Sequence, residues 1–324
     1  MKPTFSLFRL PENVIVKVLN TLYLGQLFAF SLISTKTKNL VTSLGLRAES
    51  VYISISWNIT LVVCTERFLI VINFHEDLNA QNEFLFADIT LPVDAYLPFQ
   101  DTTVQSPIPF NFIDWMNHIR TVFCFTKPQK LRFYRGSERF NIGSLKHAIG
   151  NVNAFHVSSE LTDAYIKEVL KLFNAPSDMS LDRNPFDEAW EVQQFFIQNY
   201  KVFTFFDVYS LDDMLLVNSK RVNFYCPTTR IQFNQFLHHW IRGSNPRLQS
   251  MFLSIDITDY VSIEVLLKGI HYIDVAEEEE LEICQKHNIV SDYMVQIRRK
   301  DGTTAVIAMS EREPILNVHF VVLY

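Results

Sequence analysis

From about Lys130 onward, short strand-like runs alternate with helical segments along the chain. The strand candidates are rich in β-branched and aromatic residues, whereas the segments between them have a helical period. An alternation of this kind is typical of a sheet whose strands are joined by helices. The strand candidates are KLRFY (130–134), NAFHVS (153–158), DMSLD (178–182), YKVFTFFDV (200–208), RVNFYC (221–226) and MFLSID (251–256); helical candidates include TDAYIKEVLKLF (162–173) and FDEAWEVQQFFIQNY (186–200).

The strand–helix units recur every roughly 20 to 30 residues, which is the range of leucine-rich-repeat-like α/β solenoids. A strict repeat consensus is absent from the sequence. We therefore predict an irregular, leucine-rich-repeat-like α/β sheet for this part of the chain.

Segments on both sides of this region have a purely β-rich pattern. The runs VYISIS, NITLVVCTERFLIVINF and EFLFADITL, from about Val51, predict a local antiparallel sheet. In the tail, Asp301-Gly302 separates two alternating runs, which predicts a hairpin whose two turn residues both have positive φ. The final run ILNVHFVVLY is expected to pair near this hairpin. The acidic run from Glu277 to Glu280 is expected to be a solvated helix start or loop without a metal role.

The N-terminal segment, by contrast, predicts a set of short helices. Pro11 suits the first helical position, and Glu12 follows where the helix dipole favours an anion. A small module cannot bury all the apolar residues of this segment alone, so some of them are expected to meet the rest of the chain or another protein. These residues form two sets at helical spacing: Val14, Ile15, Val18, Leu19 and Leu22, then Leu24, Leu27, Phe28, Leu32 and Ile33.

Composition limits the class of partner and the compartment. The 324 residues are 48% hydrophobic and 14% aromatic, which allows a large aromatic core, and the net charge of −6 disfavours nucleic acid as the main ligand. Four widely spaced cysteines indicate free thiols in a reducing compartment and neither disulfides nor zinc. The longest apolar run is too short to span a bilayer. We therefore expect a soluble intracellular protein, cytoplasmic or nuclear, that binds no membrane, cofactor or metal.

Catalytic motifs are missing from the sequence. It contains no G-x-S-x-G elbow, phosphate-binding glycine loop, H-E-x-x-H pair or dinucleotide fingerprint. His75-Glu76 and His238-His239 are the places where imidazoles invite a mechanism, but neither has a ligand or nucleophile at useful spacing. An enzyme with a dispersed site, such as a hydrolase, is the least favoured hypothesis.

The stretch FNQFLHHWIRGSNPR (233–247) contains the paired histidines and is typical of a capped helix. Thr229 and Gln232 match a capping box for a helix that starts at Arg230. Gly243 supplies a left-handed C-terminal residue, and Pro246 blocks continuation. Both histidines are then expected to point toward solvent, either without a role or at the surface of a protein partner. The core-facing stripe comprises Phe233, Phe236, Leu237, Trp240 and Ile241.

Two segments together resemble a known protein family. LFRLPENVIVKVLNTLYLGQLFAFSLISTKTKNLV resembles an F-box, and the segment from SLDDMLLVNSK to the FLHHWIRGSNPRLQSMFLSI run resembles the type 2 F-box-associated domain of nematode proteins. The close match covers about residues 7–45 and 190–256. The resemblance implies an F-box at residues 1–48 and an F-box-associated, substrate-binding domain at residues 49–324. The expected fold class is α+β, with a small helical F-box followed by a mixed α/β, leucine-rich-repeat-like domain that has β-rich segments at both ends.

The resemblance implies a substrate-recognition subunit of a Skp–cullin–F-box ubiquitin ligase, with no catalytic residue of its own. The F-box would bind a Skp-type adaptor and, through it, a cullin, whereas the C-terminal domain would hold a protein substrate. Before the second helix, Tyr23 stands where the family commonly has an acidic residue, and Gly25 is a weaker helix cap. In the third helix, Thr37 replaces a frequent tryptophan. Both changes are expected to weaken adaptor binding. The residues that match the apolar positions of the motif are Leu10, Pro11, Val14, Ile15, Val18, Leu19, Leu27, Phe28, Leu32 and Ile33.

A second hypothesis is a non-ligase interaction scaffold with a degenerate F-box. The sequence does not sort the apolar F-box residues into those that face an adaptor and those that face the module's own core. It also assigns no residue to substrate binding.

Overall fold

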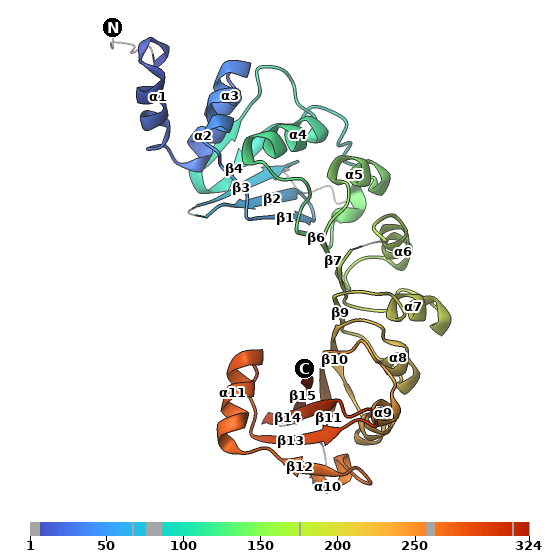
Figure 1. Cartoon of the computed structure of the whole chain (residues 1–324). Helices are drawn as coiled ribbons and strands as arrows, with labels where there is room; N and C mark the ends of the chain where they lie inside the picture. The colour runs from blue at the N-terminus through green and yellow to red at the C-terminus, as the bar shows by residue number, and fades with distance from the viewer. Residues whose placement is uncertain are drawn as a thin grey trace. The chain divides into compact units, whose positions relative to one another are not determined.

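The computed structural model describes residues 7–66, 68–75, 86–174, 176–256, 263–312 and 314–323. The chain divides into two compact units, Met1–Pro176 and Ser177–Tyr324, which are blue to green and yellow-green to red in Figure 1. The expected boundary between residues 48 and 49 is based on motifs and stays a prediction. We describe each unit by itself.

Unit 1 begins with the short helices that the sequence predicts. Pro11 precedes α1 with extended backbone (φ −54°, ψ 146°), and its carbonyl accepts hydrogen bonds from the N–H groups of Val14 and Ile15. The expectation that Pro11 is the first helical residue is therefore wrong by one position. The elements are the 3₁₀ turn η1 (Leu7–Arg9), α1 (Glu12–Leu19), α2 (Leu24–Ser31) and α3 (Thr35–Ser43).

The sheet of unit 1 has the order β7-β6-β1-β2-β3-β4-β5. Strands β1 to β5 pair antiparallel, whereas β6 pairs parallel with both β1 and β7. The bounds are β1 (Ser50–Ile55), β2 (Ile59–Cys64), β3 (Leu69–Phe74), β4 (Ala95–Leu97), β5 (Thr102–Val104), β6 (Lys130–Phe133) and β7 (Ala154–Val157).

The predicted antiparallel segment is confirmed at β1, β2 and β3, but the third run, EFLFADITL, does not form a strand in its described part, residues 86–91. Its first three residues, 83–85, lie outside the described residues, and Ala87 forms only an isolated bridge with Phe140. Asp88 explains the difference, because its carboxylate accepts hydrogen bonds from both the N–H and the hydroxyl of Thr90 and so forms a local turn.

Helices cover the sheet of unit 1 and form an aromatic core. Trp115 on α4 is fully buried against Phe74 of β3, and its indole N–H donates to the carbonyl of Val93 at 2.7 Å. The sequence patterns above do not predict α4, although its apolar face is regular. The elements are α4 (Phe112–Phe123), α5 (Ile142–Ile149), α6 (Asp163–Leu172) and the 3₁₀ turns η2 (Pro98–Gln100) and η3 (Ser137–Arg139).

The sheet of unit 2 has the order β12-β13-β14-β15-β11-β10-β9-β8. Strands β8, β9, β10 and β11 are neighbours in chain order and run parallel. The sheet continues from β11 through β15, β14 and β13 to β12, and each of these strands pairs antiparallel with the one before it. The bounds are β8 (Asp178–Leu181), β9 (Val202–Phe205), β10 (Arg221–Thr228), β11 (Ser250–Asp256), β12 (Tyr272–Asp274), β13 (Tyr293–Arg298), β14 (Thr304–Arg312) and β15 (Ile315–Leu323).

The helices of unit 2 lie on both faces of its sheet. Phe196 of α7 packs on Phe203 and Phe224, and Trp240 of α9 packs on Phe320 of β15, which places α7 and α9 on one face. Ile283 of α11 instead packs in a cluster with the next residue of β15, Val321, on the opposite face. The bounds are α7 (Ala189–Phe196), α8 (Leu211–Leu216), α9 (Arg230–Arg242), α10 (Ile263–Leu266) and α11 (Glu277–His287).

The predicted tail hairpin is confirmed, but the predicted turn type is wrong. Gly302 has φ +92°, whereas Asp301 does not have positive φ. The N–H of Gly302 donates to the carbonyl of Arg299, and the N–H of Arg299 donates to Thr303. This is a three-residue loop with one left-handed residue, in which the Asp301 carboxylate accepts from the Arg299 guanidinium and from the Thr303 N–H.

The mixed α/β class with an N-terminal helical module is confirmed, and every strand predicted from residue 130 onward is present. The leucine-rich-repeat-like character stays a prediction. The acidic run from Glu277 forms the first turn of α11, as expected, and all four cysteines are free. Within the described ranges, the helices are too short or too polar to cross a bilayer.

Candidate interaction surfaces

The structure sorts the ten predicted adaptor-binding residues into buried and accessible side chains. Five of them are buried in unit 1: Ile15, Leu19, Leu27, Phe28 and Leu32. Phe28 of α2 is fully buried, and its ring lies 5.9 Å from Trp115 and 6.5 Å from Phe123, both on α4. Phe28 therefore attaches α2 to α4, and the other four side chains are withdrawn from the surface.

The other five residues reach the surface. Val18 is 38% exposed and Ile33 is 61% exposed, and Pro11 is also exposed. Leu10 and Val14 are half-buried. The accessible apolar residues therefore come from the turn before α1, from α1 itself and from the end of α2.

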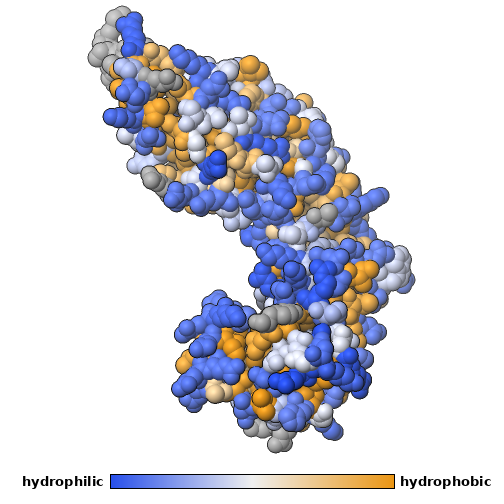
Figure 2. All heavy atoms as spheres, in the orientation of Figure 1, coloured by the Kyte–Doolittle hydropathy of each residue, from blue (hydrophilic) through white to orange (hydrophobic). Residues whose placement is uncertain are grey.

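Two further large apolar side chains of the N-terminal segment are exposed, and the sequence pattern does not assign them to adaptor binding. Phe8 is 44% exposed, with the Lys36 ammonium 4.6 Å from its ring centroid, and Tyr23 is 69% exposed. Figure 2 shows apolar surface over α1 and α2. We call the set Phe8, Leu10, Pro11, Val14, Val18, Tyr23 and Ile33 the F-box face. Exposed apolar residues gathered on one small module are typical of a protein-binding site.

The two positions that depart from the family pattern have clear structural roles. Tyr23 precedes α2, and its N–H donates to the Gln26 side chain at 3.0 Å, so the helix is capped without an acidic residue at that point and Gly25 is not its cap. Thr37 is fully buried, and its hydroxyl donates to the carbonyl of Ser34 at 2.8 Å and accepts from the Ser34 N–H at 2.9 Å. Thr37 therefore stabilises the start of α3.

A hollow of about 520 Å³ lies beside the start of α2. Its lining is mostly apolar and includes Tyr23 and Leu24 of the F-box segment, Leu69 of β3, and Phe99 of η2. Leu69 and Phe99 are exposed. The hollow continues the apolar surface at Tyr23 onto the sheet of unit 1.

Ser31 and His118 form a buried hydroxyl–imidazole pair between α2 and α4. The Ser31 Oγ lies 2.7 Å from the His118 Nε2 and donates to the Phe28 carbonyl at 2.6 Å. Burial, together with the nearby Lys38, lowers the pKa of His118 to about 4, so the imidazole is neutral near pH 7. Because both side chains are buried, this pair contributes to the attachment of the F-box helices.

The other imidazoles singled out in the sequence have structural surroundings. Burial and the nearby Arg139 lower the pKa of His75 to about 4, and its ring packs on Phe140 at 5.6 Å. Glu76 lies outside the described residues. His238 and His239 are half-buried, and the His238 Nε2 lies 3.2 Å from the Lys268 carbonyl, so the expectation that both point to solvent is wrong.

Helix α9 has most of the predicted features. Phe233, Phe236, Leu237 and Trp240 are fully buried, Ile241 is half-buried, and Gly243 ends the helix with φ +116°. The Thr229 side chain accepts from the Gln232 N–H, but the Gln232 side chain donates to the Tyr209 carbonyl at 3.2 Å and does not complete a capping box.

Asn245 is a residue whose role the sequence analysis missed. It is buried with φ +51°, and its amide donates to the carbonyls of Met214, Leu215 and Val217 at the end of α8. The residues after Gly243 in GSNPR therefore join α9 to α8. Asparagine is among the few residues that adopt positive φ readily, which could have indicated this role.

Comparison with known proteins agrees with these features. A family model described as F-box domain matches residues 7–49, and one described as F-box associated matches residues 191–253. The chain is 24% identical over 326 residues to the F-box associated domain-containing protein sdz-33 of Caenorhabditis elegans, covering 98% of this chain and 96% of the relative. No solved structure matches the chain.

The resemblance predicted at residues 7–45 and 190–256 is thus confirmed at both places. The first match covers the three N-terminal helices, and the second runs from α7 through α9 to β11, including Trp240 and Asn245. The chain therefore contains a segment that matches the F-box domain and a second segment that matches the F-box associated family.

Proposed function

We propose that this chain is the substrate-recognition subunit of a Skp–cullin–F-box type ubiquitin ligase. The F-box face would bind a Skp-type adaptor, and residues 49–324 would hold a protein substrate. The observation that carries the proposal is the F-box match at residues 7–49, on which a set of apolar side chains is exposed.

Burial of the F-box face supplies the driving force for adaptor binding. Each apolar side chain that leaves water contributes about 1.5 to 3 kcal/mol when it is fully buried, before the cost of association is subtracted. Phe28 and the other buried members of the motif would contribute indirectly, because they fix the orientation of α1 and α2.

The chain itself would supply no catalytic residue. A receptor of this kind accelerates ubiquitin transfer by holding a substrate near an enzyme that the complex carries, so the rate gain comes from proximity. The leucine-rich-repeat-like succession expected from residue 130 onward would present the substrate with an extended surface.

Charge insertion into the F-box face tests the adaptor site. Val18→Glu with Ile33→Glu places two carboxylates on exposed positions, so the fold is retained while adaptor affinity falls by about a hundredfold or more. Isothermal titration of a purified Skp-type adaptor into the full chain measures the effect.

A matched control places the same two charges on exposed apolar residues of unit 2, as Ile197→Glu with Val208→Glu. This control is expected to bind the adaptor like the unsubstituted chain. Retention of adaptor affinity by the Val18 and Ile33 variant would refute the assignment of the F-box face.

The alternative function is an interaction scaffold that binds an adaptor without entering a ligase. The departure at Thr37, where the family that the N-terminal segment resembles frequently has a tryptophan, motivates this alternative. The two functions differ in whether a cullin joins the complex.

A further inference from the structure

Among the described residues of unit 2, one face of the sheet carries no helix over its parallel strands. Along β10, Val222 and Phe224 are buried beneath the helices, whereas Arg221, Asn223 and Tyr225 alternate with them and point to the opposite face. We call this opposite side the open face. Helix α11 covers the same side only further along the sheet, over the cluster that includes Val321.

Strand register defines neighbouring positions on the open face. Arg221 pairs with Ser250 of β11, and Ser250 pairs with Val321 of β15. In the next row, Asn223 pairs with Phe252, and Phe252 pairs with His319. The side chains of each row therefore stand side by side across the strands.

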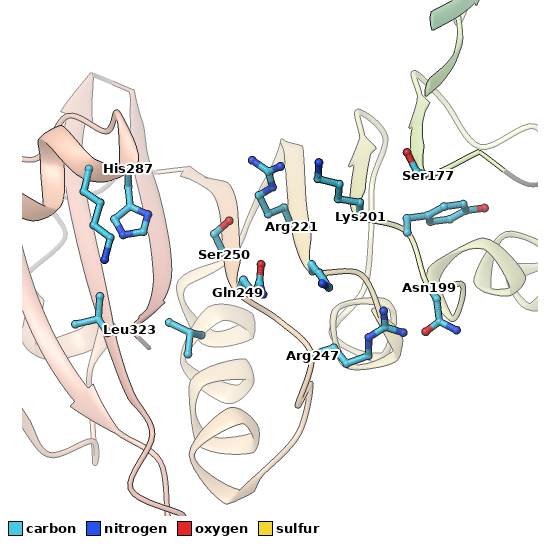
Figure 3. Close-up of a pocket in the computed structure, with 13 residues that line it drawn as sticks. Ser177, Asn199, Lys201, Arg221, Arg247, Gln249, Ser250, His287 and Leu323 are labelled. Atoms are coloured by element: carbon cyan, nitrogen blue, oxygen red, sulfur yellow. The ribbon is translucent and has the colours of Figure 1, made fainter. Parts of the chain in front are cut away.

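A strongly basic hollow of about 580 Å³ lies at the starts of β9, β10 and β11 (Figure 3). Figure 3 shows Lys201 and Arg221 extending side by side from neighbouring strands, with His287 beyond Ser250. No aspartate or glutamate is among the described residues that line the hollow. Its cationic and imidazole side chains are Lys201, Lys220, Arg221, Arg247, Lys286 and His287.

These positive charges are not neutralised within the described part of the chain. None of the five lysine and arginine side chains forms an ion pair or a side-chain hydrogen bond there. The His287 Nε2 is also buried without a hydrogen-bond partner in the described residues. In a chain of net charge −6, such a concentration of cations makes a local positive potential that an anionic ligand would relieve.

A second hollow, of about 330 Å³, adjoins the first and shares Arg221, Ser250 and His287 with it. Its other side is aromatic. Tyr225 stacks on Phe206 with ring centroids 4.4 Å apart, and lies 5.3 Å from Phe252. The Phe252 ring is in turn 4.9 Å from His319. Phe206 and Tyr225 are exposed, so apolar area remains available to a ligand.

We propose that the open face binds an acidic, extended segment of a protein substrate, with carboxylates in the basic hollow and an apolar side chain on the aromatic row. Because one hollow is basic and the adjoining one is aromatic, together they fit a peptide that carries both acidic and apolar side chains. A small polyanion would occupy only the basic hollow. Nucleic acid fits less well, because the cations are confined to one hollow. The proposal rests on the proposed function, since the bound segment belongs to the protein to be ubiquitinated.

The probe is a fluorescein-labelled peptide of glutamates around one phenylalanine, titrated with the full chain at low salt. We expect binding that weakens as salt is added, since the exposed charges are screened. Lys201→Glu with Arg221→Glu should lower affinity by about tenfold or more, because two attractive contacts become repulsive. Arg242→Glu with Arg298→Glu, a pair with the same charge change on exposed residues outside both hollows, should leave affinity unchanged.

The aromatic row is tested in the same assay. Tyr225→Ala should weaken binding of the phenylalanine peptide several-fold but leave binding of an all-glutamate peptide unchanged. A peptide with glutamine in place of every glutamate should not bind. The unfolding midpoint of each variant confirms that the sheet is retained.

Three results would overturn the proposal: no binding of the acidic peptide at low salt, equal affinities of the two charge-reversal variants, or binding of tripolyphosphate without binding of the peptide. Adaptor binding, measured in parallel, separates this inference from the proposed function. A chain that binds the adaptor but not the peptide refutes only the open-face site. A chain that binds the peptide but not the adaptor refutes only the ligase assignment.

Discussion

At the scale of single residues, His118 connects the F-box helices to the unit 1 core. Its imidazole contacts Ser31 of α2 and lies against the rings of Phe28 and Phe110, at 6.0 and 5.9 Å. Burial keeps the pKa of His118 at about 4, well below the ordinary histidine value of 6.5. The neutral form is therefore part of the folded state, and protonation favours unfolding.

This depressed pKa predicts a loss of stability in acid. Because the unfolded chain binds the proton near pH 6.5 and the folded chain only near pH 4, the contribution of His118 is complete above pH 6.5 and declines as the pH falls toward 4. His118→Gln should reduce the loss in the free energy of unfolding between pH 7 and pH 5 by on the order of 1 kcal/mol. Denaturant unfolding at the two pH values measures it.

His147→Gln is the matched control, because His147 is exposed on α5 in the same unit. It should keep the full pH dependence of the unsubstituted chain, to which the half-buried His75 also contributes. Identical pH dependence in the His118 and His147 variants would show that the imidazole of His118 is not held neutral by burial.

Residues of this kind are difficult to identify from sequence. Ser31 and His118 are 87 positions apart, and the helix that carries His118 has no distinctive motif. The paired histidines at 238 and 239 are adjacent in sequence, yet the His238 imidazole lies against the backbone carbonyl of Lys268. The burial of Phe28 likewise depends on how α2 packs on α4, which local spacing does not determine.

At the scale of elements, Asn245 joins two helices of the F-box associated region. Replacing it with alanine removes three hydrogen bonds to the end of α8 and leaves buried carbonyls unpaired, and alanine adopts its positive φ poorly. Asn245→Ala should lower the free energy of unfolding by about 1 to 3 kcal/mol and speed amide exchange in α8. Hydrogen-exchange mass spectrometry resolves the effect by segment.

Gln235→Ala, on the exposed side of α9, provides the comparison. It should change neither the unfolding free energy nor exchange in α8 appreciably. If the two variants exchanged at equal rates in α8, Asn245 would not be what anchors that helix.

The elements that the sequence predicts well are those with a strong local pattern. The strands from β6 to β11 and the helix α9 have regular periodicity and, for α9, a clear cap and stop. The sequence-based predictions fail where hydrogen bonds to a side chain set the local backbone conformation. The Asp88 turn ends a strand-like run, and the Asp301 carboxylate holds a loop of a different type from the one that Asp-Gly favours.

At the scale of the whole molecule, the two candidate interfaces belong to different compact units. The F-box face lies in unit 1, and the open face lies in unit 2. The basic hollow could not be predicted, because its side chains come from separate segments around residues 201, 221, 247 and 286. In sequence these lysines and arginines lie far apart, and the fold brings the starts of β9 and β10, the segment before β11 and the end of α11 together around the hollow.

We propose that this chain joins a cullin through a Skp-type adaptor. The most direct test mixes the purified full chain, adaptor and cullin and measures the mass of the complex by size-exclusion chromatography with light scattering. We predict one complex that contains all three proteins and that loses only this chain when Val18→Glu and Ile33→Glu are introduced. A complex of chain and adaptor that excludes the cullin, or no complex at all, would contradict the assignment as a ligase subunit.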